Sequence, residues 1–132
     1  MFSEPTTLIT EGIRVTVRTA YIKEESNPRK NRYVFAYQIN ISNESRESVQ
    51  LMRRKWLITD AYGRKRIVQG AGVIGRQPEL APGESQQYTS GCDFTTPLGK
   101  MEGFFFMIRI NDGSDFRVRI PSFPLVKPEI LN

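Results

Sequence analysis

The sequence contains no histidine and a single cysteine, Cys92, among its 132 residues. Without imidazole and with one thiol, the chain cannot assemble the His and Cys ligand sets that bind zinc, cobalt or nickel. It also cannot form a Ser-His or Cys-His pair for nucleophilic catalysis. No two carboxylates have a spacing that singles them out for acid–base chemistry. We therefore expect a protein that is not an enzyme and that has no metal site and no cofactor.

Long apolar runs and a signal peptide are also absent from the sequence. Mean hydropathy is -0.42, and no apolar stretch is long enough to span a bilayer. The first residues include Glu4 and Glu11 and lack a basic segment followed by an apolar one. Cys92 cannot pair within the chain, which fits a reducing compartment, and we expect a small buried or half-buried thiol rather than a nucleophile. These features predict a cytoplasmic protein with no membrane contact.

Alternation of apolar and polar residues dominates the sequence and predicts strands. It is clearest over residues 13–21 and 33–41. In residues 49–59 it places Trp56 and Ile58 on one face and Leu51 on the other, before a turn at residues 60–63 begins a hairpin. The remaining strands are expected at residues 64–69, 85–90, 104–110 and 116–120, with turn-rich connections at 91–103 and 111–114 and an extended, Pro-rich segment at 121–132. About seven strands without a helix predict an all-β fold, an antiparallel sandwich of the immunoglobulin or fibronectin type III kind.

Residues 70–84, GAGVIGRQPELAPGE, contain a G-x-G-x-x-G motif. A dinucleotide fingerprint needs a helix directly after its glycines, and Pro78 and Pro82 would break that helix. In that case the glycines adopt backbone conformations with positive φ or allow another part of the backbone to approach closely. Alternatively, their amides form an anion nest for phosphate or pyrophosphate, and this candidate site consists of Gly70, Gly72, Gly75 and Arg76. Because the prolines restrict the chain, we also expect an ordered surface that binds a protein partner, formed by Val73, Ile74, Gln77 and Leu80.

Two further groups of charged residues suggest ligands. The net charge is +5, and the predicted hairpin gathers a candidate nucleic-acid surface from Arg53, Lys55, Arg64, Lys65 and Arg66. This interpretation is the weaker one, because neither a nucleic-acid motif nor an aromatic platform accompanies the charges. Asp112, Ser114 and Asp115 offer oxygens that a hard cation such as magnesium would accept. A tight hairpin turn explains the same residues without a metal.

Two gapped motifs run through the middle of the sequence. The first consists of Val68, Gly70, Gly72, Val73, Gly75, Gln77, Pro78, Leu80, Pro82, Gly83 and Glu84. The second consists of residues 88–92 with Thr96, Pro97, Gly99, Met101, Gly103 and Met107. On these residues the sequence resembles the ApaG family over about residues 3–127, which would form one domain followed by a short tail at 128–132. It departs from the family pattern at Lys55, where many members have histidine, and at residues 64–66, where many are more acidic.

The resemblance implies a fibronectin type III-like sandwich and a link to cobalt tolerance and magnesium efflux. It also implies that related eukaryotic domains serve protein interaction. Together with the missing catalytic groups, it favours a cytoplasmic, non-enzymatic binding module for an unknown protein partner. The alternatives are a phosphate-containing small molecule bound at the glycine segment and, less favoured, nucleic acid bound at the basic hairpin.

Overall fold

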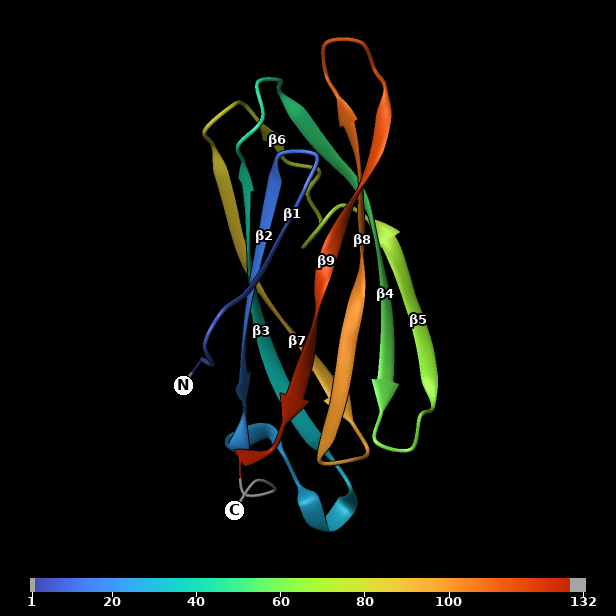
Figure 1. Ribbon diagram of the computed structural model, residues 1–132. Helices are drawn as coiled ribbons and strands as arrows, with labels where there is room; N and C mark the ends of the chain where they lie inside the picture. The colour runs from blue at the N-terminus through green and yellow to red at the C-terminus, as the bar shows by residue number, and fades with distance from the viewer. Residues whose placement is uncertain (1, 129–132) are drawn as a thin grey trace.

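Nine strands form two antiparallel sheets that pack face to face in a computed structural model, which describes residues 2–128 (Figure 1). The strands are β1 (Thr6–Thr10), β2 (Ile13–Tyr21), β3 (Tyr33–Asn43), β4 (Val49–Asp60), β5 (Lys65–Ala71), β6 (Glu79–Leu80), β7 (Ser85–Phe94), β8 (Leu98–Arg109) and β9 (Asp115–Val126). The first sheet has the order β1-β2-β3-β7, and the second has the order β5-β4-β8-β9, with β6 also paired to β4. The predicted all-β antiparallel sandwich is confirmed. It exceeds seven strands because the short strands β1 and β6 were not predicted.

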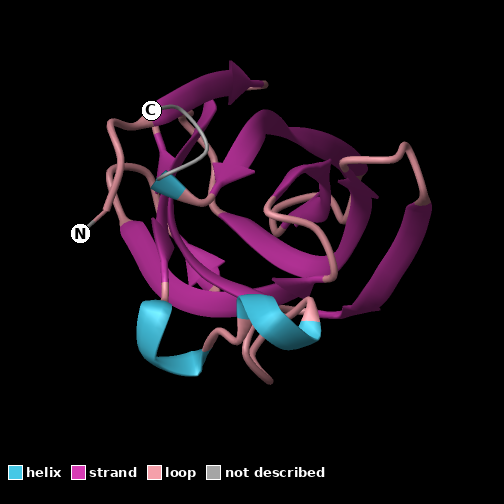
Figure 2. Cartoon of the chain, turned by 90° about the horizontal axis from the view of Figure 1, so that it is seen from below, coloured by secondary structure: helices cyan, strands magenta, loops and turns pink. Residues whose placement is uncertain are grey.

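Two single-turn 3-10 helices, η1 (Lys23–Glu25) and η2 (Pro28–Lys30), connect β2 to β3. Figure 2 views the molecule from the end that carries them and shows the two sheets on either side of the core. Within residues 2–128, no helix has the length and apolar character needed to cross a membrane. Residues 129–132 of the predicted tail lie outside the described residues.

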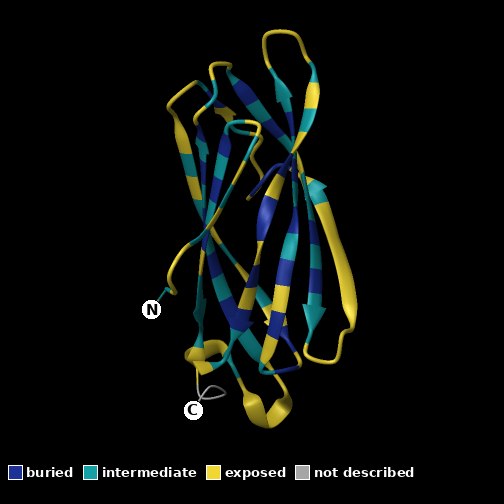
Figure 3. Ribbon diagram, viewed as in Figure 1, coloured by how far each residue is buried: buried dark blue, intermediate teal, exposed yellow. Residues whose placement is uncertain are grey.

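The core lies between the sheets and follows directly from the alternation in the sequence. In β2, Ile13, Val15 and Val17 are at most 1% exposed, whereas the residues between them are partly exposed. The same period of two continues through β3, as the banding in Figure 3 shows. Because successive side chains of a strand point to opposite faces, the alternating parts of β2 and β3 contribute every second residue to the core.

The face prediction for β4 is wrong at Leu51. Leu51 and Trp56 are both buried, at 0% and 2% exposure, although an uninterrupted strand would point them to opposite faces. The register against β8 shifts between Leu51 and Arg53, so that Met52 is the extra residue of a β-bulge. A bulge reverses which residues face inward, and it therefore buries both halves of β4.

The predicted connection at residues 91–103 is also wrong. Strands β7 and β8 occupy nearly all of it, and only residues 95–97 separate them. Gly99 and Gly103, which suggest turns in the sequence, lie within strand β8 instead, where a neighbouring group leaves no room for a side chain. A Cβ on Gly103 would lie 2.0 Å from the Lys55 carbonyl oxygen, and one on Gly99 would lie 2.4 Å from the Phe94 ring. The segment at 121–126 is extended as expected, but it is the second half of β9.

The two long flanks of the sandwich differ. On one flank, β9 contacts both β1 and β2 across the gap between the sheets. The other flank is formed by the edge strands β5 and β7. Every residue of β5 from Lys65 to Gln69 is exposed, as the continuous exposed strand in Figure 3 shows. The candidate functional features of the protein lie along this second flank and on the outer face of the second sheet.

Candidate functional site

The glycine segment forms a small hairpin that projects beyond the end of β5. Val73 and Arg76 exchange two backbone hydrogen bonds, of 2.8 Å and 2.9 Å, across the two residues between them. Those two residues, Ile74 and Gly75, have φ values of 47° and 71°. Positive φ at both central positions is the geometry of a type I′ turn. We call residues 73–76 the hairpin tip.

Gly70 and Gly72 are required by close packing around this hairpin. A Cβ on Gly72 would lie 1.9 Å from the Arg76 carbonyl oxygen, and one on Gly70 would lie 2.8 Å from Nη1 of Arg54. The amides of Gly72, Val73 and Arg76 already donate to the carbonyl oxygens of Met52, Arg76 and Val73. Two amides of the proposed nest, those of Gly72 and Arg76, are thus engaged in the fold, and anion binding by Gly70, Gly72, Gly75 and Arg76 stays a prediction.

The four residues predicted to contact a partner have different surroundings. Ile74 is 60% exposed at the hairpin tip, whereas Val73 and Leu80 are 3% exposed. The expected exposure is therefore wrong for Val73 and Leu80, which belong to the core because Val73 ends the hairpin ladder and Leu80 pairs with Val49. Gln77 is exposed and donates from its amide Nε2 to the Met52 carbonyl oxygen over 3.0 Å.

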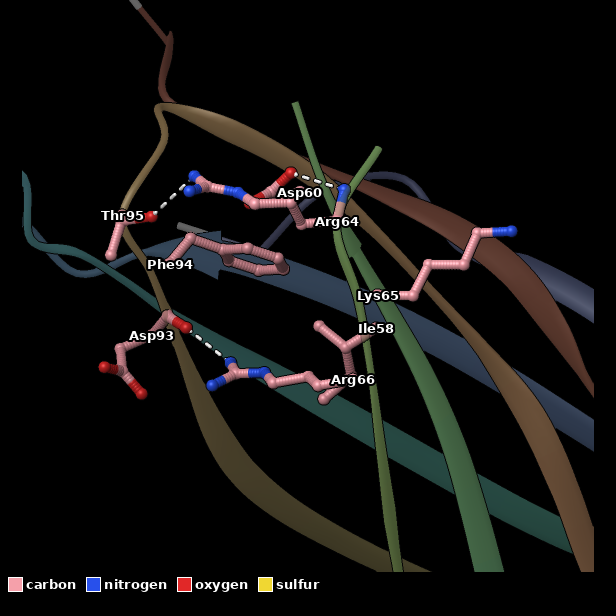
Figure 4. A pocket seen from close by; sticks show the side chains of 8 residues that line it. All are labelled: Ile58, Asp60, Arg64, Lys65, Arg66, Asp93, Phe94 and Thr95. Carbon is pink, nitrogen blue, oxygen red and sulfur yellow. Dashed lines mark hydrogen bonds and ion pairs between the residues drawn. The ribbon is translucent and has the colours of Figure 1, made fainter. Parts of the chain in front are cut away.

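The five basic residues predicted to form one patch are divided between two places. Arg53 and Lys55 lie on the outer face of the second sheet, opposite to the face that buries Trp56. Figure 4 shows that Lys65 points away from Arg66, which extends toward β7. Arg66 donates to the Asp93 carbonyl oxygen and, over 3.2 Å, to Sγ of Cys92.

Arg64 lies in the β4–β5 turn and is paired. Its Nε donates to the Asp60 carboxylate over 2.6 Å, and its Nη2 lies 3.4 Å from the Thr95 hydroxyl (Figure 4). A pocket of about 220 Å³ lies between this turn and the end of β7. The predicted single basic patch therefore does not form, although Arg53, Lys55 and Lys65 remain on one exposed side.

The outer face of the second sheet carries an aromatic platform that the sequence interpretation missed. Phe104 and Phe106 of β8 are half-buried there. The guanidinium of Arg53 lies 4.4 Å from the centre of the Phe106 ring, and that of Arg117 lies 4.9 Å from the centre of the Phe104 ring. Alternation along β8 places both rings opposite to buried Phe105, which was a usable signal in the sequence.

A second cleft, of about 370 Å³, opens between β5 and β7. We call it the flank cleft. Side chains from both sheets and from the hairpin tip line it. They include Tyr37 of β3, Arg54, Trp56 and Ile58 of β4, Arg66 and Val68 of β5, Ile74 of the hairpin tip, Tyr88, Ser90, Cys92 and Asp93 of β7, and Met101 of β8.

Burial dominates the protonation chemistry of the flank cleft. It raises the pKa values of Tyr37, Tyr88 and Cys92 above their ordinary values, and for Cys92 it outweighs the opposing charge and hydrogen bond of Arg66. Cys92 is half-buried, as predicted, and its thiol is protonated at neutral pH. Tyr88 is notable because its buried hydroxyl oxygen has no hydrogen-bond partner among residues 2–128. The nearby guanidinium charge of Arg54 acts on both tyrosines.

The acidic turn between β8 and β9 has a local structure of its own. Asp112 Oδ1 accepts hydrogen bonds from the Ser114 amide and hydroxyl, at 2.9 Å and 2.7 Å. These bonds account for Asp112 and Ser114 within the hairpin. In the part of the chain that the structure describes, no three His, Cys, Asp or Glu side chains gather where they could hold a metal ion.

Comparison with known proteins gives a consistent picture. A family model for the ApaG domain matches residues 23–109. The Protein ApaG of Mesorhizobium japonicum is 51% identical over 120 residues, covering 91% of this chain and 92% of that protein. The Protein ApaG of Brucella abortus strain S19 is 49% identical over 121 residues, covering 92% of each. A crystal structure of a Bordetella pertussis protein described as ApaA superposes with a TM-score of 0.85 at 43% identity, covering 88% of this chain and 94% of that one.

Proposed function

The chain belongs to the ApaG family, and from this premise we propose that it is a non-enzymatic, cytoplasmic module that binds a protein partner through Ile74 at the hairpin tip. Ile74 carries the proposal because it combines two unfavourable properties. Its side chain is 60% exposed, and its backbone has a φ of 47°. An isolated exposed isoleucine is ordinary, and so is glycine at positive φ, but a β-branched residue at positive φ is an outlier.

The conformation of Ile74 has a measurable cost. A non-glycine residue held in a sparsely populated backbone region costs on the order of 1–3 kcal/mol, and asparagine or glycine would reduce that cost. The Ile74 side chain is mostly in solvent, so the burial of apolar surface within the domain offsets little of this conformational cost. Such strain is frequent at binding sites, and we infer that Ile74 is there to contact another molecule.

The non-enzymatic part of the proposal rests on the lack of catalytic groups. The sequence supplies no histidine, and the thiol of Cys92 is protonated at neutral pH. We propose that any link to cobalt tolerance or magnesium efflux is indirect and operates through the bound protein. Cobalt, a borderline ion, prefers imidazole and thiolate ligands. Magnesium prefers oxygen ligands, and no three Asp or Glu side chains gather to hold a metal ion within residues 2–128.

The substitution Ile74→Asp tests this proposal. We expect it to abolish partner capture in affinity purification from the native host, read by mass spectrometry, while the melting temperature stays within about 2 °C of the parent value, because a charge at an exposed site is not buried. Ile110→Asp is the matched control, since Ile110 is an exposed isoleucine at 41% in a different turn. Capture that survives in Ile74→Asp, or that is lost equally in Ile110→Asp, would contradict the proposal.

A second candidate function is contact with single-stranded nucleic acid on the outer face of the second sheet. The observation that favours it is the platform of Phe104 and Phe106 between Arg53 and Arg117. Aromatic rings on a sheet and guanidinium planes are the groups on which unpaired bases stack, and nearby cations neutralise phosphates.

A further inference from the structure

Arg54 is a guanidinium without a carboxylate partner. Four other arginines have a carboxylate oxygen at 2.6 to 3.5 Å, namely Arg14, Arg32, Arg64 and Arg109. The remaining arginines of the described chain are exposed to solvent. Arg54 is half-buried in the flank cleft, and within residues 2–128 no carboxylate lies within ion-pair distance of it. A buried or half-buried charge is normally paired, so the position of Arg54 points to an anion supplied from outside the domain.

The fold holds the Arg54 guanidinium in one place. Its Nη1 donates to the carbonyl oxygens of Ala71 and Gly72, each over 3.0 Å. The guanidinium also lies against Gly70, where a Cβ would come within 2.8 Å of Nη1. Two carbonyls fix the orientation of the group but do not neutralise its charge. The donors on Nη2 and Nε are not engaged by any hydrogen bond to residues 2–128, and they form one planar edge of the guanidinium.

Tyr88 supplies a second donor on the opposite wall. Its hydroxyl oxygen is buried and has no hydrogen-bond partner in the described part of the chain, which is rare for a buried polar atom. Burial raises its pKa, so the hydroxyl carries its proton and can donate. The charge of Arg54 acts on this hydroxyl across the flank cleft. Arg54 and Tyr88 both line the flank cleft, which places the two donor groups around one volume.

Part of the lining of the flank cleft is apolar. It includes the side chains of Trp56, Ile58, Val68, Ile74 and Met101. The far end is already occupied by protein groups, because Arg66 donates to Cys92 and to the Asp93 carbonyl oxygen. The Asp93 carboxylate is directed away from Arg66 in Figure 4 and lies 3.5 Å from Arg32. A cleft of about 370 Å³ is in the size range of small-ligand sites.

We propose that the flank cleft binds a carboxylate carried on an apolar group, with Arg54 and Tyr88 holding the carboxylate and the apolar group resting on Val68, which is exposed next to the buried Trp56. A carboxylate fits better than a phosphate for two reasons. The free edge of a single guanidinium matches the two oxygens of a carboxylate, and one guanidinium balances a monoanion rather than a dianion. The carboxylate belongs either to a free small molecule or to a side chain or chain end of a bound protein. Because it rests on Arg54 and Tyr88, the proposal is independent of the role of Ile74.

Isothermal titration with 3-phenylpropionate tests the proposal, and the neutral 3-phenylpropanamide and inorganic phosphate serve as comparison ligands. We expect the carboxylate to bind with a dissociation constant of about 1 mM or tighter, and the amide and phosphate to bind at least tenfold more weakly. Equal affinity for the carboxylate and its amide would overturn the proposal, because the apolar walls alone would then account for binding.

Substitutions in the cleft then assign the binding to the two residues. We expect Arg54→Gln to weaken 3-phenylpropionate binding at least tenfold and Tyr88→Phe to weaken it about fivefold. Tyr88→Phe guards against misfolding, because removing an unpartnered buried hydroxyl leaves the melting temperature unchanged or raised. Arg18→Gln, an exposed arginine on β2, is the control and should retain the parent affinity. Unchanged affinity in a folded Tyr88→Phe and Arg54→Gln, or an equal loss in Arg18→Gln, would overturn the proposal.

Competition distinguishes the two sources of the carboxylate. If saturating 3-phenylpropionate prevents capture of the partner by the parent protein, the carboxylate belongs to that partner. If capture is unaffected while the titration shows binding, the cleft serves a free small molecule. Loss of capture in Ile74→Asp with unchanged titration of 3-phenylpropionate separates the hairpin tip from the flank cleft, so either proposal can fail without the other.

Discussion

Gly72 and Gly75 lie three residues apart and both have positive φ, at 59° and 71°, yet their surroundings differ. A Cβ at Gly72 would collide with the Arg76 carbonyl oxygen at 1.9 Å, whereas a Cβ at Gly75 would have open space around it. We expect Gly72→Ala to lower the free energy of unfolding by about 3 kcal/mol or more, and Gly75→Ala by only about 1 kcal/mol. Urea denaturation measures both. Equal losses would mean that the hairpin tip yields to the added methyl group.

Single residues of the candidate site could be predicted only where local sequence determines exposure. The exposure of Ile74 is predicted because it lies in a long segment rich in Gly and Pro between two strands, and such connections run over the surface. Val73 and Leu80 were misjudged, because β6 pairs with β4 and draws the segment onto the core. Arg54 and Tyr88 could not be paired from the sequence at all. They are 34 positions apart on different sheets, and only the packing of the sheets brings them together.

At the scale of elements, the turn of the β8–β9 hairpin is expected to make the stability of the fold depend on pH. The Ser114 hydroxyl and amide donate to Asp112, and these bonds lower the pKa of the Asp112 carboxyl. A folded pKa below the unfolded value of about 3.9 contributes stability above roughly pH 4 that is lost as pH falls through the folded pKa. We expect Asp112→Ala to lower the melting temperature at pH 7 and to approach the parent value below pH 3. A difference that stays constant over this range would assign the effect of Asp112 to turn geometry rather than charge.

The predictability of the elements follows their regularity. β2 and β3 were predicted because uninterrupted alternation leaves one register that buries the apolar face. The face of β4 was not, because the bulge at Met52 leaves no mark in composition. The predicted ranges of β7 and β8 are too short, because glycine in a strand has the same sequence signature as glycine in a turn. At Gly99 and Gly103 a neighbouring ring and carbonyl oxygen require it, and those neighbours come from the fold.

At the scale of the whole molecule, part of the positive charge of the chain gathers on the outer face of the second sheet. Four basic residues surround the outer aromatic platform. Arg53 and Arg117 pair in register with Phe106, and Lys55 and Arg119 pair with Phe104.

If this face contacts nucleic acid, the affinity for an unstructured oligothymidine should fall steeply between 50 and 200 mM salt, by about tenfold or more. The double substitution Arg53→Ala and Arg117→Ala should reduce the slope of log affinity against log salt by about 1–2. Fluorescence anisotropy measures both, and no binding at 50 mM salt would exclude this function.

Trp56 is the single tryptophan of the chain, and it lies in the wall of the flank cleft. It is 2% exposed and makes edge-to-face contacts with Tyr37 and Phe123, at 5.4 Å and 5.8 Å between ring centres. All tryptophan emission of the protein therefore comes from one indole, two residues from Arg54 and shielded from solvent. The molecule therefore contains its own optical probe. We expect its emission to be blue-shifted in the folded state, to resist quenching by acrylamide, and to respond to occupation of the flank cleft without any label.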